Sequence, residues 1–122
     1  MKQVSLPSFF TIILGFFLLA EGIWGLFSPT VFGIFSTNYL HAAIHILLGA
    51  IGIRVGYADR PLAYCLFVGL LLLVVGILRL VPGASELIVR LLNVNLAVAY
   101  LNICIGIVSL LMALFTKRIP TD

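Results

Sequence analysis

The sequence predicts an all-α membrane protein with four transmembrane helices. Two observations carry this prediction: 63% of the 122 residues are hydrophobic and only 9% are charged, and the hydrophobic residues fall into four long segments. A water-soluble domain carries roughly 25% charged residues. A chain with so few charges would expose large apolar patches in water, so lipid is its natural solvent.

Each hydrophobic segment is long enough to cross a bilayer, because a helix needs about 20 apolar residues to span the ~30 Å hydrocarbon layer. The segments cover residues 8–27, 38–56, 61–81 and 93–115, and Ser28-Pro29, the polar turn before Pro61, and Pro82-Gly83 separate them. Connections this short place neighbouring helices antiparallel. We therefore expect a single transmembrane domain over residues 1–122, built as an antiparallel four-helix bundle of two tandem helical hairpins.

The basic residues predict the orientation of this bundle. One side carries Lys2, Arg54, Arg60, Lys117 and Arg118, and the other carries Arg79 and Arg90. Positive charge collects on the cytoplasmic side, so both termini should be cytoplasmic and the loops at 30–37 and 82–92 should face outward. The second loop should hold a short surface helix capped by Ser85. A net charge of +3, scattered in this way, does not indicate nucleic-acid binding.

The two halves of the chain resemble one another. Gly15 and Gly22 match Gly69 and Gly76, while Asn38, His45 and Gly49 match Asn95, Asn102 and Gly106. We interpret this as an internal repeat of a helical hairpin, with one copy at about residues 8–56 and the other at about 61–115. Two copies with an even number of spans insert the same way, so their pseudo-two-fold axis would follow the membrane normal.

Small and polar residues form stripes along the predicted helices at steps of three and four. The second segment carries Asn38, His41, His45, Gly49, Gly52 and Gly56, and the fourth carries Asn95, Val98, Asn102, Gly106, Ser109 and Ala113. Helices in lipid associate through close approach at small residues and through polar contacts. These stripes therefore predict a left-handed bundle with both histidines facing inward.

Ionisable and amide side chains should meet in one layer of this bundle. Glu21 lies about 9 Å below the outer end of its helix and His45 about 10 Å below the start of its own, at 1.5 Å per residue. Asn102 reaches the same level, with His41 one turn higher and Arg79 near the outer end. An ionisable group at such depth costs about 2.5–3.5 kcal/mol, so these groups should be paired or functional.

Three roles for this layer are compatible with the sequence. It can be a structural network that fixes the helix register. It can ligate a tetrapyrrole, haem or chlorophyll, through His45 or His41, with Glu21, Asn38, Asn102 and Arg79 in support. It can also lie on the path of a small-solute or proton transporter. A Ser–His–Asp set, a phosphate loop and a zinc motif are absent from the sequence, so we expect neither an enzyme nor a metal site.

The second segment and the loop before it also carry a family resemblance. The residues that carry it are Gly33, Ile34, Phe35, Asn38, Leu40, His41, His45, Leu47, Gly49 and Gly52, with Pro82-Gly83 after the third segment. This pattern resembles a family of small four-helix bacterial membrane proteins catalogued as a domain of unknown function (DUF4383-like). The chain departs from it at Ala42, where the family usually has Asn, and at Val98 and Asn102, in a helix where the family commonly has a histidine.

These observations together favour a small non-enzymatic integral membrane protein. We expect an accessory or structural subunit of a larger membrane complex, whose partners are the lipid bilayer and either other membrane subunits or further copies of itself. We expect the protein to be located in a bacterial inner membrane, or in a photosynthetic or respiratory membrane. No activity follows from the resemblance, because the family has none assigned.

Overall fold

The computed structural model describes residues 4–116 of the chain. In this part, the long helices are α1 (Leu6–Gly25), α2 (Tyr39–Tyr57), α3 (Leu62–Arg79) and α5 (Leu96–Leu114), and α4 (Ala84–Leu92) is short. The four long helices are apolar enough to cross a membrane, and they begin and end within three residues of the predicted segments. Lys2, Lys117 and Arg118, used above for orientation, lie outside the described residues.

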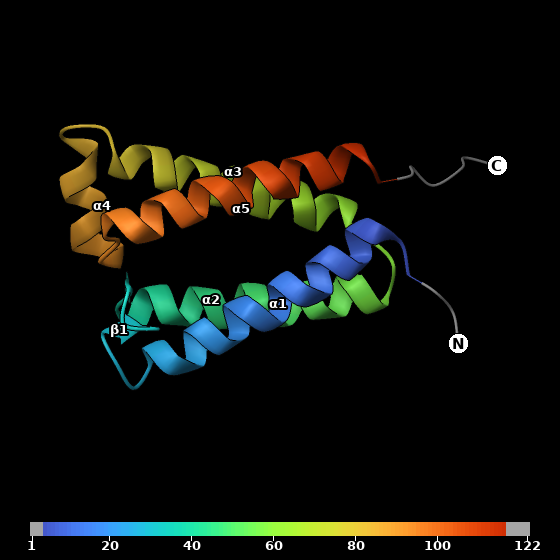
Figure 1. Ribbon diagram of the computed structural model, residues 1–122, viewed down its shortest axis with the longest axis horizontal. Coiled ribbons are helices and arrows are strands. Elements are labelled where there is room, and N and C mark those ends of the chain that lie inside the picture. Colours follow the sequence, from blue (N-terminus) through green and yellow to red (C-terminus); the bar gives the residue numbers. More distant parts are fainter. Residues whose placement is uncertain (1–3, 117–122) are drawn as a thin grey trace.

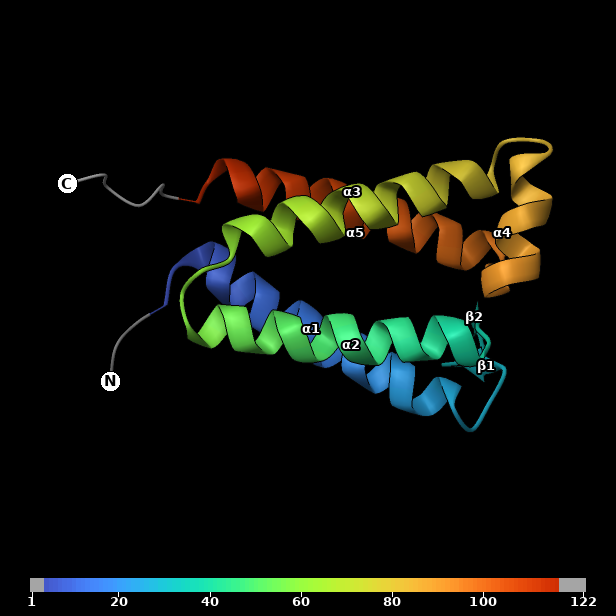
Figure 2. The same cartoon turned by 180° about the vertical axis from the view of Figure 1, so that it is seen from behind.

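The long helices pair as two antiparallel hairpins, α1 with α2 and α3 with α5 (Figures 1 and 2). Glycine lets the backbones touch within each hairpin. A Cβ atom placed on Gly49 would lie 2.6 Å from the carbonyl oxygen of Gly15, and one on Gly106 would lie 2.8 Å from that of Gly69. Both distances are shorter than real Cβ contacts, so the predicted close approach at small residues holds within each hairpin.

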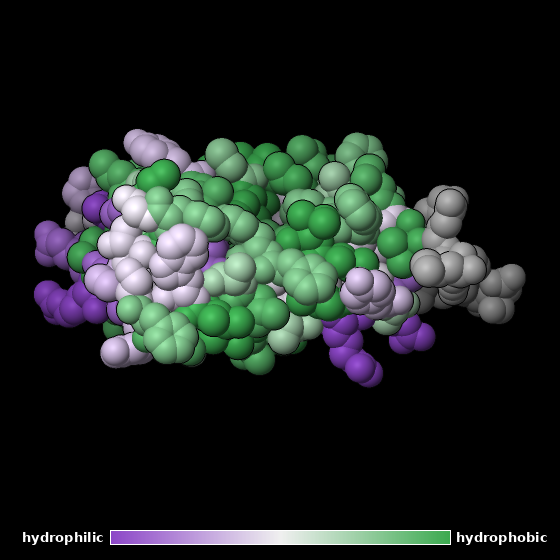
Figure 3. Space-filling model, turned by 60° about the horizontal axis from the view of Figure 1, so that its bottom comes forward, coloured by the Kyte–Doolittle hydropathy of each residue, from purple (hydrophilic) through white to green (hydrophobic). Residues whose placement is uncertain are grey.

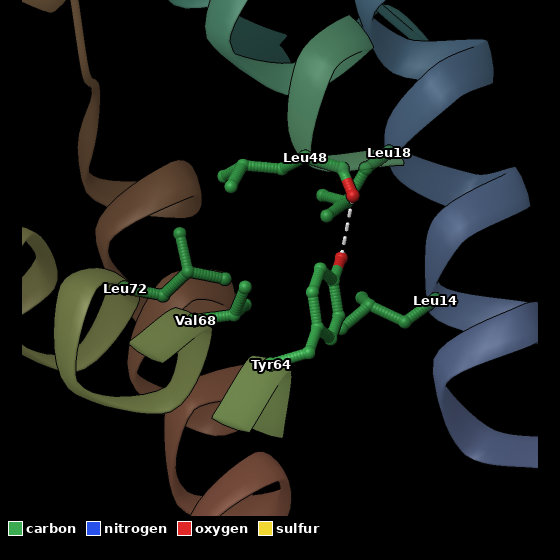
Figure 4. Close-up of a cluster of buried hydrophobic side chains, with 6 residues drawn as sticks. All are labelled: Leu14, Leu18, Leu48, Tyr64, Val68 and Leu72. Atoms are coloured by element: carbon green, nitrogen blue, oxygen red, sulfur yellow. Dashed lines mark hydrogen bonds between the residues drawn. The ribbon is translucent and has the colours of Figure 1, made fainter. Parts of the chain in front are cut away.

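Larger side chains fill the space between the two hairpins (Figure 4). Leu14, Leu18 and Leu48 of the first hairpin meet Tyr64, Val68 and Leu72 of the second, and we call these six residues the apolar plug. The hydroxyl of Tyr64 donates to the carbonyl oxygen of Leu48 over 2.7 Å. Gly52 makes room for this ring, because a Cβ there would lie 2.5 Å from the Tyr64 hydroxyl oxygen. Gly52 thus accommodates a side chain of the other hairpin.

One end of the bundle carries both longer loops, and we call it the loop end; α1 begins and α5 ends at the opposite end, which we call the terminus end (Figure 1). The first loop contains a small antiparallel pair of strands, β1 (Thr30–Val31) and β2 (Phe35–Ser36), which the sequence did not predict. Phe32 and Gly33 between them both have positive φ, 56° and 69°, as a type I′ turn requires. For Phe32 this costs about 1–2 kcal/mol. Its ring packs edge-on against Trp24, with centroids 4.8 Å apart.

The second loop contains the expected short helix, α4. Its cap differs from the prediction, because Gly83, with φ of 91°, precedes the helix, whereas Ser85 lies inside it. The hydroxyl oxygen of Ser85 accepts a hydrogen bond from Arg79 instead. α4 therefore starts from a glycine turn, and Ser85 ties it to the end of α3.

Hydrophobic side chains form a broad band across the middle of the face seen in Figure 3, and hydrophilic side chains gather towards its ends. Exposed apolar residues occur on every long helix, for example Phe16, Leu47, Phe67 and Leu111. This distribution is typical of helices surrounded by lipid rather than water.

Candidate functional site

The histidines and Glu21 form a linear chain near the loop end. Nδ1 of His45 lies 3.4 Å from Oε1 of Glu21, and Nε2 of His45 lies 3.0 Å from Nε2 of His41. Nδ1 of His41 lies 3.0 Å from the carbonyl oxygen of Leu92, at the end of α4. All three side chains are buried, with 5–7% of each residue exposed. The predicted convergence of Glu21, His45 and His41 is therefore present in the structure.

The donor and acceptor properties of these atoms determine how many exchangeable protons Glu21, His45 and His41 hold together. The Leu92 carbonyl only accepts, so Nδ1 of His41 carries a hydrogen. A second hydrogen lies between the two Nε2 atoms. A third belongs between His45 and Glu21, because otherwise two bare acceptors would face each other in a buried site. With three protons the net charge of the three side chains is zero, which lowers the cost of placing them at membrane depth.

Asparagine caps join the same region to the second hairpin. The side-chain oxygen of Asn38 accepts from the backbone N–H of His41, which caps α2, and its amide nitrogen donates to the Leu91 carbonyl over 2.9 Å. Asn95 caps α5 in the same way through Val98, and its amide donates to the Ile34 carbonyl over 2.9 Å. Each hairpin thus holds a loop of the other.

Ser36 and Asn93 add further bonds between the loops. The Ser36 hydroxyl donates to the Asn93 carbonyl and accepts from the backbone N–H of Asn95, and the Asn93 amide donates to the Thr37 carbonyl. Asn93 has a left-handed backbone, φ 51° and ψ 51°, which ends α4 and suits asparagine. We refer to these bonds, with those of Asn38, His41 and Asn95, as the latch.

Contrary to the prediction from the sequence, Arg79 does not join the layer of Glu21, His45 and His41. Its Nε donates to the Val94 carbonyl over 2.6 Å, and its Nη1 donates to the Ser85 hydroxyl over 2.7 Å. The backbone of the α4–α5 connection supplies an acceptor close to the end of α3, and the guanidinium turns towards it. Arg79 therefore braces the second hairpin, and within residues 4–116 the ion-pair partner of Glu21 is His45.

A small cavity lies beside the row of Glu21, His45 and His41. It has a volume of about 10 Å³ and is lined by Glu21, Val31, Phe35, Ser36, Thr37, His41, His45, Val98, Leu101 and Asn102. Asn102, predicted to share the layer, reaches it at this cavity and is 3% exposed. Oε1 of Glu21 is buried, and beyond its 3.4 Å contact with His45 it has no hydrogen-bond partner among the described residues. The cavity is thus about the size of one water molecule, and polar side chains lie among its apolar lining residues.

Sequence reasoning identified the side chains of the layer but missed the latch. The Leu91 and Leu92 carbonyls are orphan acceptors at the end of α4, and any helix end leaves such groups unsatisfied. The only signal for their partners was the repeated asparagine at the start of α2 and α5, which typically marks an N-cap. Nothing in the sequence indicated that the free amide hydrogens of these caps reach across to the other hairpin.

The histidines do not fit tetrapyrrole ligation in this structure. An axial ligand needs a free ring nitrogen with open space beside it. Both nitrogens of His41 and both nitrogens of His45 face internal partners, and the neighbouring cavity of about 10 Å³ cannot admit a macrocycle. In residues 4–116 there is also no group of three or more His, Cys, Asp or Glu side chains arranged to hold a metal ion.

The fold and the site define a class of protein: a small helical protein with four candidate transmembrane helices and a buried layer of Glu and His side chains at one end. The family described as "Domain of unknown function (DUF4383)" matches residues 28–115. Since this is more than half of the sequence, the chain belongs to that family. No curated protein and no solved structure matches the chain.

Proposed function

We propose that the protein is a non-enzymatic accessory or structural subunit of a larger membrane complex, with the loop end facing outward and both termini cytoplasmic. One observation carries this proposal: the ionisable side chains within the spans of the first hairpin contact one another and the backbone inside the molecule. Glu21, His45 and His41 contact one another and the Leu92 carbonyl, so both ring nitrogens of each histidine face partners inside the protein. In this role the layer fixes the register of the two hairpins.

The shape of the protein supports a partner inside the bilayer. The structure has little surface outside the long helices, where the longest element is the nine-residue α4. Its large exposed side chains are mainly apolar and lie along the spans, for example Phe16 on α1 and Phe67 on α3. A partner protein, or a second copy, would therefore meet these helices laterally, through van der Waals packing and small residues.

We further propose that the chain arose by duplication of one hairpin. The latch supports this, because it is reciprocal: Asn38 donates to Leu91 and Asn95 donates to Ile34. Ile34 and Leu91 are separated by as many residues as Asn38 and Asn95, as a pseudo-two-fold axis requires. The glycine contacts are also equivalent, Gly15 with Gly49 in the first hairpin and Gly69 with Gly106 in the second.

The alternative functions receive less support from the geometry. Haem or chlorophyll ligation would require His41 or His45 to break its internal contacts. A proton or solute path would have to continue below the polar layer, where the apolar plug of Leu14, Leu18, Leu48, Tyr64, Val68 and Leu72 fills the space between the hairpins. Transport would therefore need a rearrangement of this plug.

Photo-crosslinking in the native host membrane tests the subunit role. A photoreactive amino acid replaces Phe16 on α1 in one variant and Phe67 on α3 in another, since both side chains are exposed to lipid. We expect a discrete crosslinked protein, or a crosslinked second copy, from one of these faces and only lipid adducts from the other. Lipid adducts alone from both faces, and from matched positions Leu47 and Leu111, would refute the subunit proposal.

A further inference from the structure

The cavity beside Glu21 has the properties of a water site. Oε1 of Glu21 is buried, and apart from its 3.4 Å ion-pair contact with Nδ1 of His45 it has no hydrogen-bond partner among the described residues. Glu21 lines this cavity together with Asn102 and the hydroxyl-bearing residues Ser36 and Thr37. This long contact leaves part of the hydrogen-bonding capacity of a buried carboxylate oxygen unused, which is unfavourable because the lost hydration is not replaced. A water molecule needs a cavity of about 10–15 Å³ and at least two polar partners, and both conditions are met here.

The groups around this cavity include one acid and two bases. Glu21 comes from α1, and His41 and His45 come from α2. α5 contributes Val98, Leu101 and Asn102, and the segment that contains β1 and β2 contributes Val31, Phe35, Ser36 and Thr37, none of which is charged. Arg79 on α3 is turned away to Val94 and Ser85. The Glu21–His45–His41 chain is therefore the only titratable group around the cavity within residues 4–116.

The cavity is close to one surface and closed towards the other. Ser36 and Thr37, which line it, belong to the loop end, and α2 begins directly after them at Tyr39. On the other side, Leu18 is 1% exposed and Val68 is fully buried, and both belong to the apolar plug. The Glu21–His45–His41 group therefore lies close to the loop end, whereas the apolar plug separates it from the terminus end.

We propose that Glu21, His45 and His41 form a proton-binding site, which exchanges protons with the loop end through one water molecule held between Glu21 and Asn102. On uptake, a hydronium ion transfers a proton to the Glu21 carboxyl and leaves as water. Glu21, His45 and His41 then hold four protons in place of three, and the net charge of these three side chains rises from zero to +1. Release reverses this step. The site binds a proton without conducting it, because the apolar plug closes the way to the other end.

NMR of ¹⁵N-histidine-labelled full-length protein in lipid nanodiscs tests proton binding directly, since ring nitrogen shifts report protonation. We expect the chemical shifts of the His45 ring nitrogens to change in one step when the sample is acidified, and Glu21→Gln to abolish that step. Ser109→Ala is the matched control: it removes another buried polar group of α5, two turns from Asn102, and should leave the step unchanged. An unchanged step in Glu21→Gln, or no step in the wild type, would overturn the proposal.

Two further measurements test the water and the closed end. Asn102→Leu removes one water partner while keeping the side-chain size, and it should slow exchange of the His45 ring proton with water at least tenfold; unchanged exchange would exclude the bridging water. Liposomes containing the wild-type protein should show no proton flux above empty liposomes under a pH gradient. Flux that Glu21→Gln removes would show that the site conducts, against the proposal. Circular dichroism and size-exclusion chromatography confirm that each variant is folded.

Discussion

Replacing Gly49 by alanine should weaken the packing of α1 against α2. The new Cβ would lie 2.6 Å from both the Gly15 carbonyl oxygen and the Leu19 backbone nitrogen, whereas ordinary contacts begin at 3.4 Å. The helices must therefore separate by about 0.8 Å at their closest point, because backbone atoms cannot move aside independently. Overpacking of this kind costs about 1–3 kcal/mol, and the better helix propensity of alanine offsets up to about 1 kcal/mol of it.

We expect a net loss of about 1–2 kcal/mol in the free energy of unfolding. Titration of the purified protein from a mild detergent into sodium dodecyl sulfate, followed by circular dichroism, measures this quantity. Ala50→Leu is the control, because Ala50 is the next residue of α2 after Gly49 and its side chain is exposed. This substitution should change the free energy of unfolding by less than about 0.5 kcal/mol. If Gly49→Ala were as stable as the wild type, the two helices would not be in backbone contact at this point.

Three more predictions concern the latch, the plug and the turn. Asn38→Leu and Asn95→Leu each remove a helix cap and a bond to the other hairpin, so each should lose about 1–3 kcal/mol in the same unfolding assay, and equal stability to wild type would exclude a stabilising latch. Tyr64→Phe leaves the Leu48 carbonyl without its side-chain donor and should cost about 1 kcal/mol, while Tyr57→Phe on the exposed surface should cost nothing measurable. Phe32→Asn suits the type I′ turn but removes the ring that packs on Trp24, so the fluorescence of this single tryptophan should shift to longer wavelength; an unchanged spectrum would mean that the contact is absent.

The polar layer was partly predictable because its members follow simple helix geometry. Glu21 and His45 were placed at the same depth by counting residues from the helix ends, and the structure brings them to 3.4 Å. His41 and His45 are four residues apart and share a helix face. Arg79 was misplaced by the same count, because depth alone does not tell which of several acceptors a long side chain reaches, and the Val94 carbonyl is one of them.

Gly52 shows that a stripe of small residues does not reveal which part of the protein packs against it. The stripe through Gly49, Gly52 and Gly56 correctly predicted a buried face of α2. A stripe of small residues does not distinguish a neighbouring backbone from a neighbouring side chain, however. Gly49 meets the backbone of α1, whereas Gly52 meets the ring of Tyr64 from α3.

The sequence by itself predicted lipid surroundings, four spans and their antiparallel pairing. These follow from local properties, namely the length of the hydrophobic segments, the turn residues between them and the short connections. The sequence also determined that ionisable groups lie within the spans. Only the tertiary structure decided what those groups bind. Partners of these groups and of the asparagine caps are backbone carbonyls, a group that every residue carries: those of Ile34, Leu91, Leu92 and Val94. These carbonyls became acceptors because the fold brings the loops close to the side chains that donate to them. Backbone acceptors have no side-chain signature, so contacts of this kind depend on the three-dimensional path of the chain.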